Sequence, residues 1–66
     1  MKWLPATGSV QRSADFVYMV MQANSMDWVA YYTPKNEAAE EIVVRPTDEA
    51  ARAACEEHQR ALIRRA

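Results

Sequence analysis

The chain has few of the residues from which small proteins usually gain extra stability or chemistry. Its 66 residues include one cysteine, one histidine and one glycine. A single cysteine excludes an internal disulfide and a cysteine-rich zinc site, and it is typical of a reducing compartment. No apolar run approaches the roughly 20 residues of a membrane-spanning helix, and Met1–Pro5 lacks the apolar centre of a signal peptide. We therefore expect one cytoplasmic domain with no metal, no cofactor and no small-molecule substrate.

The chain also lacks a strong charge of either sign. Its formal net charge is −1 at pH 7, so no global basic field predicts binding to nucleic acid. A domain of this length buries only about 60% of the surface of its unfolded chain. Without disulfides or metal, oligomerisation or binding to a protein partner is the means of stabilisation that remains.

The most informative positive feature is the segment Phe16–Met21, which is apolar on both faces of a strand. Side chains alternate along a strand, so Phe16, Tyr18 and Val20 share one face and Val17, Met19 and Met21 share the other. Aromatic and β-branched residues predict a returning strand at 28–33 and a short third strand at 41–45. A short edge strand at 9–12 is a further option.

The segment 47–65 predicts a helix. Thr47 is suited to cap the first turn, and Asp48 and Glu49 suit the positive end of the helix dipole. Glu56 and Arg60 have the spacing of an (i, i+4) ion pair. The 3.6-residue period places small side chains on the buried stripe, which consists of Ala51, Ala54, Cys55, His58, Ala61 and Leu62.

These elements predict an α+β domain in which a small antiparallel sheet packs on one C-terminal helix, in the order β-β-β-α. Residues 1–14 are irregular or form the edge strand, residues 15–45 form the sheet, and residues 47–65 form the helix. The expected helix-facing side comprises Phe16, Tyr18, Val20, Trp28, Ala30, Tyr32, Ile42 and Val44. One helix covers one face only, so the N-terminal segment, a second copy or a partner must cover the other face. That face is our candidate partner-binding surface: Val17, Met19, Met21, Val29, Tyr31 and Val43.

Three further sets of residues invite a functional interpretation. Cys55 and His58 lie one turn apart and resemble a thiolate–imidazole pair, although a small core cysteine beside a boundary histidine is the plainer interpretation, and we assign no catalytic residue. An acidic surface is a second hypothesis, formed by Glu37, Glu40, Glu41, Glu49 and Glu56. A third is nucleic-acid binding through the C-terminal arginines Arg60, Arg64 and Arg65 and the aromatic residues of the sheet.

The chain has two resemblances, of which the first covers most of its length. It resembles small uncharacterised phage and prophage proteins of βββα type, through the following residues in order: Trp3, Gly8, Ser13, Tyr18–Val20, Trp28–Tyr31, Thr47–Ala50, Glu57 and His58. The segments Trp28–Pro34 and Thr47–Ala50 also resemble the N-terminal unit of HicB-type antitoxins, although Arg45-Pro46 stands where that family usually has a glycine before the threonine. Both resemblances imply a protein partner.

We therefore expect a non-enzymatic module that binds protein through an apolar sheet face, either as a homodimer or by docking on a larger protein. The phage resemblance implies, as its most specific version, an inhibitor of a host defence system such as an anti-CRISPR. Nucleic-acid binding is the alternative function.

Overall fold

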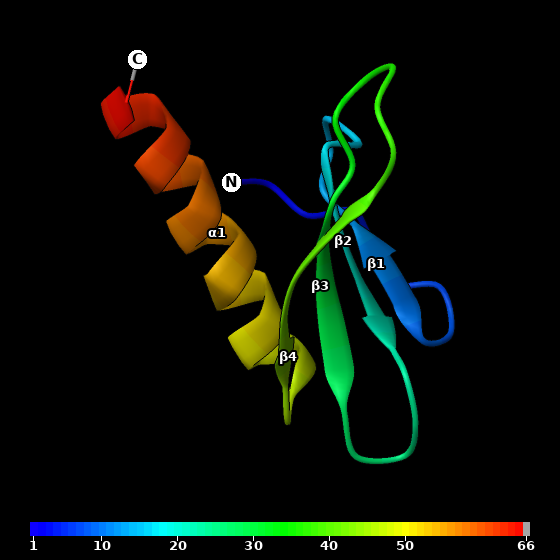
Figure 1. The fold of residues 1–66 in the computed structure, drawn as a ribbon. Helices are drawn as coiled ribbons and strands as arrows, with labels where there is room; N and C mark the ends of the chain where they lie inside the picture. Colours follow the sequence, from blue (N-terminus) through cyan, green and yellow to red (C-terminus); the bar gives the residue numbers. More distant parts are fainter. Residues whose placement is uncertain (66) are drawn as a thin grey trace.

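The computed structural model describes residues 1–65, in which four strands precede one helix. The elements are β1 (Val10–Arg12), β2 (Tyr18–Gln22), β3 (Trp28–Tyr32), β4 (Glu40–Arg45) and α1 (Asp48–Arg65). The strands form one antiparallel sheet in the order β1-β2-β3-β4, so each strand pairs with its neighbour in sequence (Figure 1). The predicted α+β architecture is confirmed, with the short edge strand present as β1.

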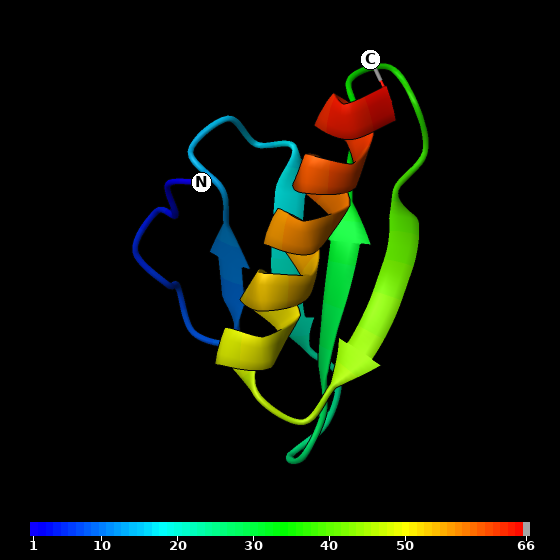
Figure 2. The same ribbon diagram turned by 90° about the vertical axis from the view of Figure 1, so that its left-hand side faces the viewer.

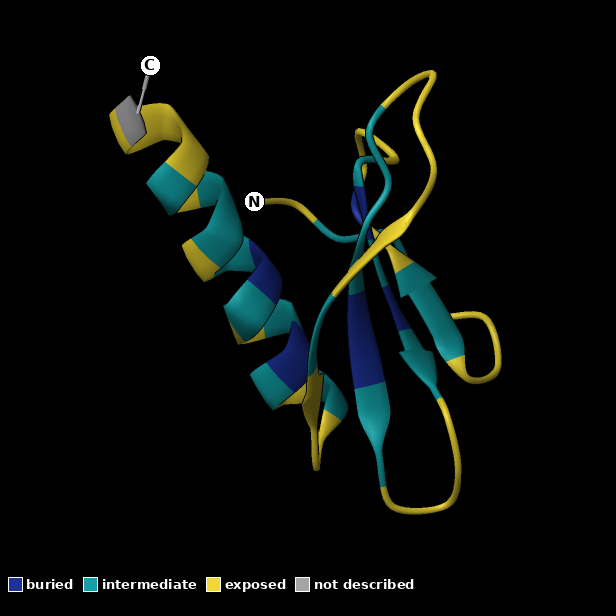
Figure 3. Ribbon diagram, in the orientation of Figure 1, coloured by how far each residue is buried: buried dark blue, intermediate teal, exposed yellow. Residues whose placement is uncertain are grey.

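The helix α1 lies across one face of the sheet, in front of β2 and β3 in Figure 2. The buried core joins Tyr18 and Val20 of β2, Ala30 of β3, and Ala51 and Cys55 of α1. Figure 3 shows these buried segments on the facing sides of helix and sheet. Because Ala51 and Cys55 are small, the helix approaches the bulkier side chains of the sheet closely.

The beginning of α1 has the predicted cap. The Thr47 hydroxyl oxygen accepts from the backbone N–H of Ala50 at 3.1 Å, which satisfies one of the free N–H groups of the first turn. The predicted Glu56–Arg60 ion pair is wrong. Arg60 instead pairs with Glu57 at 2.6 Å, because Glu56 lies on the side of the helix where it accepts from Trp3 Nε1 at 3.3 Å.

The N-terminal segment lies along the outer edge of β1. The N–H of Leu4 donates to the carbonyl oxygen of Arg12, and the N–H of Ala14 donates to that of Lys2, each at 2.9 Å. The hydrogen bond from Trp3 to Glu56 places the indole on the α1 side of the sheet. The segment therefore extends the β1 edge and does not cross the face opposite α1.

Phe16 does not continue β2, contrary to the predicted helix-facing set. It precedes the strand, has a φ of 60° and is 60% exposed. The cause is a turn in which the Ser13 hydroxyl donates to Asp15 Oδ1 at 2.5 Å and accepts from the N–H of Tyr18 at 3.0 Å. The hydrogen bond from Ser13, with a second from the N–H of Val17, lowers the pKa of Asp15.

A β-bulge exchanges the two faces within β4. Val43 lies opposite Ala30, but the next pair along is Glu41 with Tyr31, so Ile42 is the extra residue. Ile42 and Val43 consequently both point to the α1 side, where both pack against the core. The predicted positions of Val43 and Val44 are therefore wrong: Val43 faces the helix, and Val44, 44% exposed, faces away from it.

Candidate functional site

The face of the sheet opposite α1 is built from two straight rows of side chains, one residue from each strand. We call this surface the open face. The first row is apolar throughout and consists of Val10, Met21, Val29 and Val44. The second row has Met19 and Tyr31 in its middle and a charge at each end, Arg12 on β1 and Glu41 on β4. Apolar residues thus occupy the middle of the face, and opposite charges lie on its two edges.

The burial of each side chain in the first row depends on whether side chains of adjacent strands flank it on one side or on both. Val29 is only 5% exposed because Met21 and Val44 flank it on the adjacent strands. Met19, Met21 and Tyr31 are half-buried, and Val44 on the edge strand is exposed. Among residues 1–65 the one helix lies on the other side of the sheet, so no second layer covers these rows (Figure 1).

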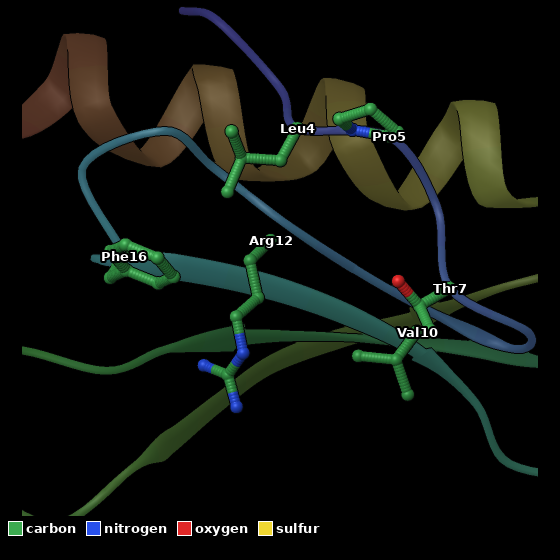
Figure 4. A pocket seen from close by; sticks show the side chains of 6 residues that line it. All are labelled: Leu4, Pro5, Thr7, Val10, Arg12 and Phe16. Carbon is green, nitrogen blue, oxygen red and sulfur yellow. The ribbon is translucent and has the colours of Figure 1, made fainter.

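A pocket of about 250 Å³ borders the open face at its β1 edge. Its lining includes Leu4 and Pro5 of the N-terminal segment, Val10 and Arg12 of β1, and the exposed ring of Phe16 (Figure 4). Val10 and Arg12 are also the β1 members of the two rows, so the pocket is continuous with the open face. The N-terminal segment therefore borders this surface at one edge only.

The structure brings together four of the six residues that we predicted for partner binding. Met19, Met21, Val29 and Tyr31 are adjacent on β2 and β3. Val17 precedes β2 and packs against the buried core, and Val43 faces α1 because of the bulge. The missed members of the two rows are Val10, Arg12, Glu41 and Val44, and Phe16 beside them was also missed. The Ser13-x-Asp15 pattern, typical of a turn, was the one indication in the sequence that Phe16 lies outside the strand.

The predicted acidic residues do not form one surface. Glu37, Glu40 and Glu41 are exposed on β4 and the loop before it, whereas Glu49 is on the first turn of α1. Because the chain passes from the end of β4 directly into α1, Glu49 lies beyond the opposite end of β4 from Glu40. Glu56 is half-buried and bonded to Trp3.

Cys55 and His58 have environments that disfavour a nucleophilic pair. Cys55 is fully buried, and this burial raises the pKa of its thiol to about 11, whereas a nucleophilic cysteine needs a lowered pKa. His58 Nδ1 lies 2.8 Å from the hydroxyl of Tyr18. Burial also raises the pKa of Tyr18 to about 12, so its phenol keeps a proton with which to bond the imidazole. Cys55 and the hydrogen-bonded pair of His58 and Tyr18 thus contribute to packing between α1 and the sheet.

The arginines and sheet aromatic residues on which the nucleic-acid hypothesis rests do not lie together on one surface. Tyr18 is buried, Trp28 and Tyr32 pack against the core, and only Tyr31 of the sheet tyrosines lies on the open face. Arg60 is paired with Glu57, Arg64 is exposed, and the side chain of Arg65 lies outside the described part of the chain. Tyr31 lies on the face opposite α1, so it does not form one platform with Arg60 and Arg64 of the helix.

Together these observations define a small α+β domain with one sheet face covered by a helix and one uncovered. No protein-family model matches the chain, and no curated protein or solved structure is significantly similar to it. Within residues 1–65, no group of histidine, cysteine and carboxylate side chains is arranged to hold a metal ion. The helix in that range is not long and apolar enough to cross a membrane.

Proposed function

We propose that this protein is a non-enzymatic binding module that docks its open face on a larger protein. The observation that carries the proposal is the uninterrupted apolar row Val10–Met21–Val29–Val44 on the side of the sheet that α1 leaves uncovered. Exposed contiguous apolar surface is uncommon on small proteins that act alone, and it is typical of interaction sites.

The polarity of the open face supports this proposal. Arg12 and Glu41 lie at its two edges, while the middle is apolar and contains a tyrosine. Protein interfaces commonly have an apolar, aromatic-rich centre and a polar rim. Met19 and Met21 add side chains that adapt their shape to a partner at low energetic cost.

Phe16 extends this surface with a fixed aromatic group. Its ring is 60% exposed, yet its backbone is held at a φ of 60°, a conformation costly for a bulky residue. The carbonyl oxygen of Phe16 lies 3.0 Å from the Thr33 hydroxyl, and its N–H donates to Ser13 at 3.0 Å. Strain that surrounding bonds maintain is often found at binding sites, and a pre-positioned ring loses little entropy when a partner binds.

The setting that we propose is the cytoplasm of a host cell, with a host defence protein as the partner. An anti-CRISPR inhibitor encoded by a phage is the most specific form of this proposal. Its support is the resemblance to small phage proteins together with the apolar open face of the sheet.

The test starts from tagged protein incubated with host lysate, after which the captured protein is purified and titrated directly. We expect Met19→Asp and Tyr31→Asp each to weaken its binding by about 100-fold, as for a charge placed in an interface centre. Ile63→Asp is the matched control because Ile63 is 68% exposed on α1, away from the open face. Circular dichroism verifies that all three variants fold.

The proposal fails if both open-face variants bind the purified partner like the wild type. It also fails if Ile63→Asp weakens binding as much as they do, because the surface would then involve α1. A mobility shift of nucleic acid that disappears steeply with added salt would favour the alternative function.

A further inference from the structure

The two edges of the sheet differ in what they offer to another strand. On the β1 side, backbone hydrogen bonds from Leu4 and to Lys2 occupy the edge. On the other side, β4 is the outermost strand of the described chain, and Figure 2 shows no segment beyond it. With six residues, β4 is also longer than any other strand. The backbone groups of β4 that point away from β3 can therefore pair with an added strand, once Arg45 Nη1 releases the Val44 carbonyl oxygen to which it donates at 3.1 Å.

The charges on β4 are arranged so that the strand is complementary to itself. Glu40 and Glu41 begin the strand, Arg45 ends it, and the three residues between them are apolar. In an antiparallel pair of two β4 strands centred between Ile42 and Val43, Glu40 lies opposite Arg45 of the second copy. A parallel pair would place Glu beside Glu and Arg beside Arg, which is unfavourable. Charge thus selects the antiparallel arrangement.

The bulge gives this pair an apolar centre on the α1 side. Ile42 and Val43 line a groove of about 280 Å³ between β4 and α1, together with Ala54, Ala61 and His58. In the antiparallel pair, Ile42 of each copy lies beside Val43 of the other, so the second copy closes the outer side of the groove. Arg45 and Glu57 border the same groove and supply its polar rim.

Bulges and terminal charges on an edge strand usually protect it against pairing with unrelated strands. On β4 the same devices favour a second copy, because its Arg45 and Glu40 lie opposite Glu40 and Arg45 of the first copy; Glu41 then lies opposite Val44 on the open-face side. We propose that a second copy of this chain docks on the β4 edge by antiparallel β4–β4 pairing. The two four-stranded sheets then become continuous, with both open faces still uncovered. This inference is independent of the proposed function.

A charge-exchange experiment tests the pairing. Sedimentation velocity over a dilution series should show a reversible dimer for the wild type. Glu40→Arg and Arg45→Glu should each weaken it by roughly tenfold or more, since two attractive pairs per dimer become repulsive. An equimolar mixture of the two variants should restore wild-type affinity as a heterodimer, because both opposed pairs are attractive again.

Glu37→Arg and Arg64→Glu are matched controls, since they change the same charges at exposed positions outside β4. A wild type that stays monomeric up to about 1 mM overturns the inference, because that limit corresponds to very weak association. Failure of the mixture to recover overturns the antiparallel register. Equal weakening by the controls overturns the β4 edge as the interface. Met19→Asp should leave the dimer intact, which separates this result from the open-face test.

Discussion

Raising the pH should unfold this domain through two groups buried between α1 and the sheet. The pKa of the Cys55 thiol rises from 9.0 to about 11, and that of the Tyr18 phenol from 10.0 to about 12, in both cases chiefly because burial disfavours the charged form. The folded protein therefore keeps both protons at pH values where the unfolded chain has lost them. Stability is fully present below about pH 9 and is lost as the pH rises through these windows.

The size of the loss follows from the two pKa shifts. Each shift of about two units corresponds to roughly 3 kcal/mol. The two contributions are not fully independent, because the charge of an ionised Cys55 also raises the pKa of Tyr18. A domain of this length has a total stability of about 3–10 kcal/mol. The Cys55 contribution disappears between pH 9 and about 11, and the Tyr18 contribution between pH 10 and about 12. We therefore expect marginal folding, or none, at the upper end of this range.

Urea unfolding followed by circular dichroism at a series of pH values measures this loss. Cys55→Ala should lower stability at pH 8 by about 1 kcal/mol through lost packing. It should also remove the decline in the free energy of unfolding between pH 9 and 10. In that range the wild-type decline comes from Cys55, because the Tyr18 contribution is lost only above pH 10. Tyr18→Phe should retain that decline and reduce the one above pH 11. Two observations would refute the reasoning: rapid reaction of a thiol reagent with the folded protein at pH 8, or identical alkaline unfolding of the wild type and Cys55→Ala.

Two stability predictions concern backbone conformation. Thr47→Ala should destabilise the protein by about 1 kcal/mol, because the N–H of Ala50 loses its acceptor, whereas Thr47→Asn should be nearly neutral; thermal unfolding of both variants checks the cap. Phe16→Asn should stabilise by about 0.5–1 kcal/mol, because asparagine tolerates a φ of 60° and little buried area is lost. Phe16→Leu keeps the strain and should show no such gain in urea unfolding; equal effects of the two substitutions would contradict the strain argument.

The helix could be predicted closely from the sequence because several local features agree. Thr47 caps the first turn, acidic residues follow, and the alanine-rich stripe begins at Ala51. The predicted segment 47–65, with Thr47 as its cap, therefore agrees closely with the observed α1. The strands were also predicted within a few residues, since aromatic and β-branched segments alternate with short polar turns. These elements could be predicted because the local helix and strand propensities agree with the pattern of buried residues.

The faces of the sheet were less predictable because they depend on which residues of each strand point to the same side. One extra residue in β4 reverses the side on which every following residue points, and the run Ile42–Val43–Val44 is apolar in either phase. Phe16 was misplaced for a different reason. Aromatic residues favour strands, and the side-chain bonds of Ser13 and Asp15 overrode that preference. Half of the residues of the open face, including Val10 and Val44, could therefore be identified only from the strand register of the structure.

The order of the strands has a consequence for how the chain folds. Each pairing in the sheet joins neighbouring segments, so the hairpins close short loops and are expected to form quickly. The core is different, because Ala51 and Cys55 supply its far wall from α1. During synthesis the sheet emerges first, and its Tyr18, Val20 and Ala30 side chains stay exposed until the second turn of the helix has left the ribosome. We expect the nascent sheet to engage chaperones during this interval, which ends when α1 docks.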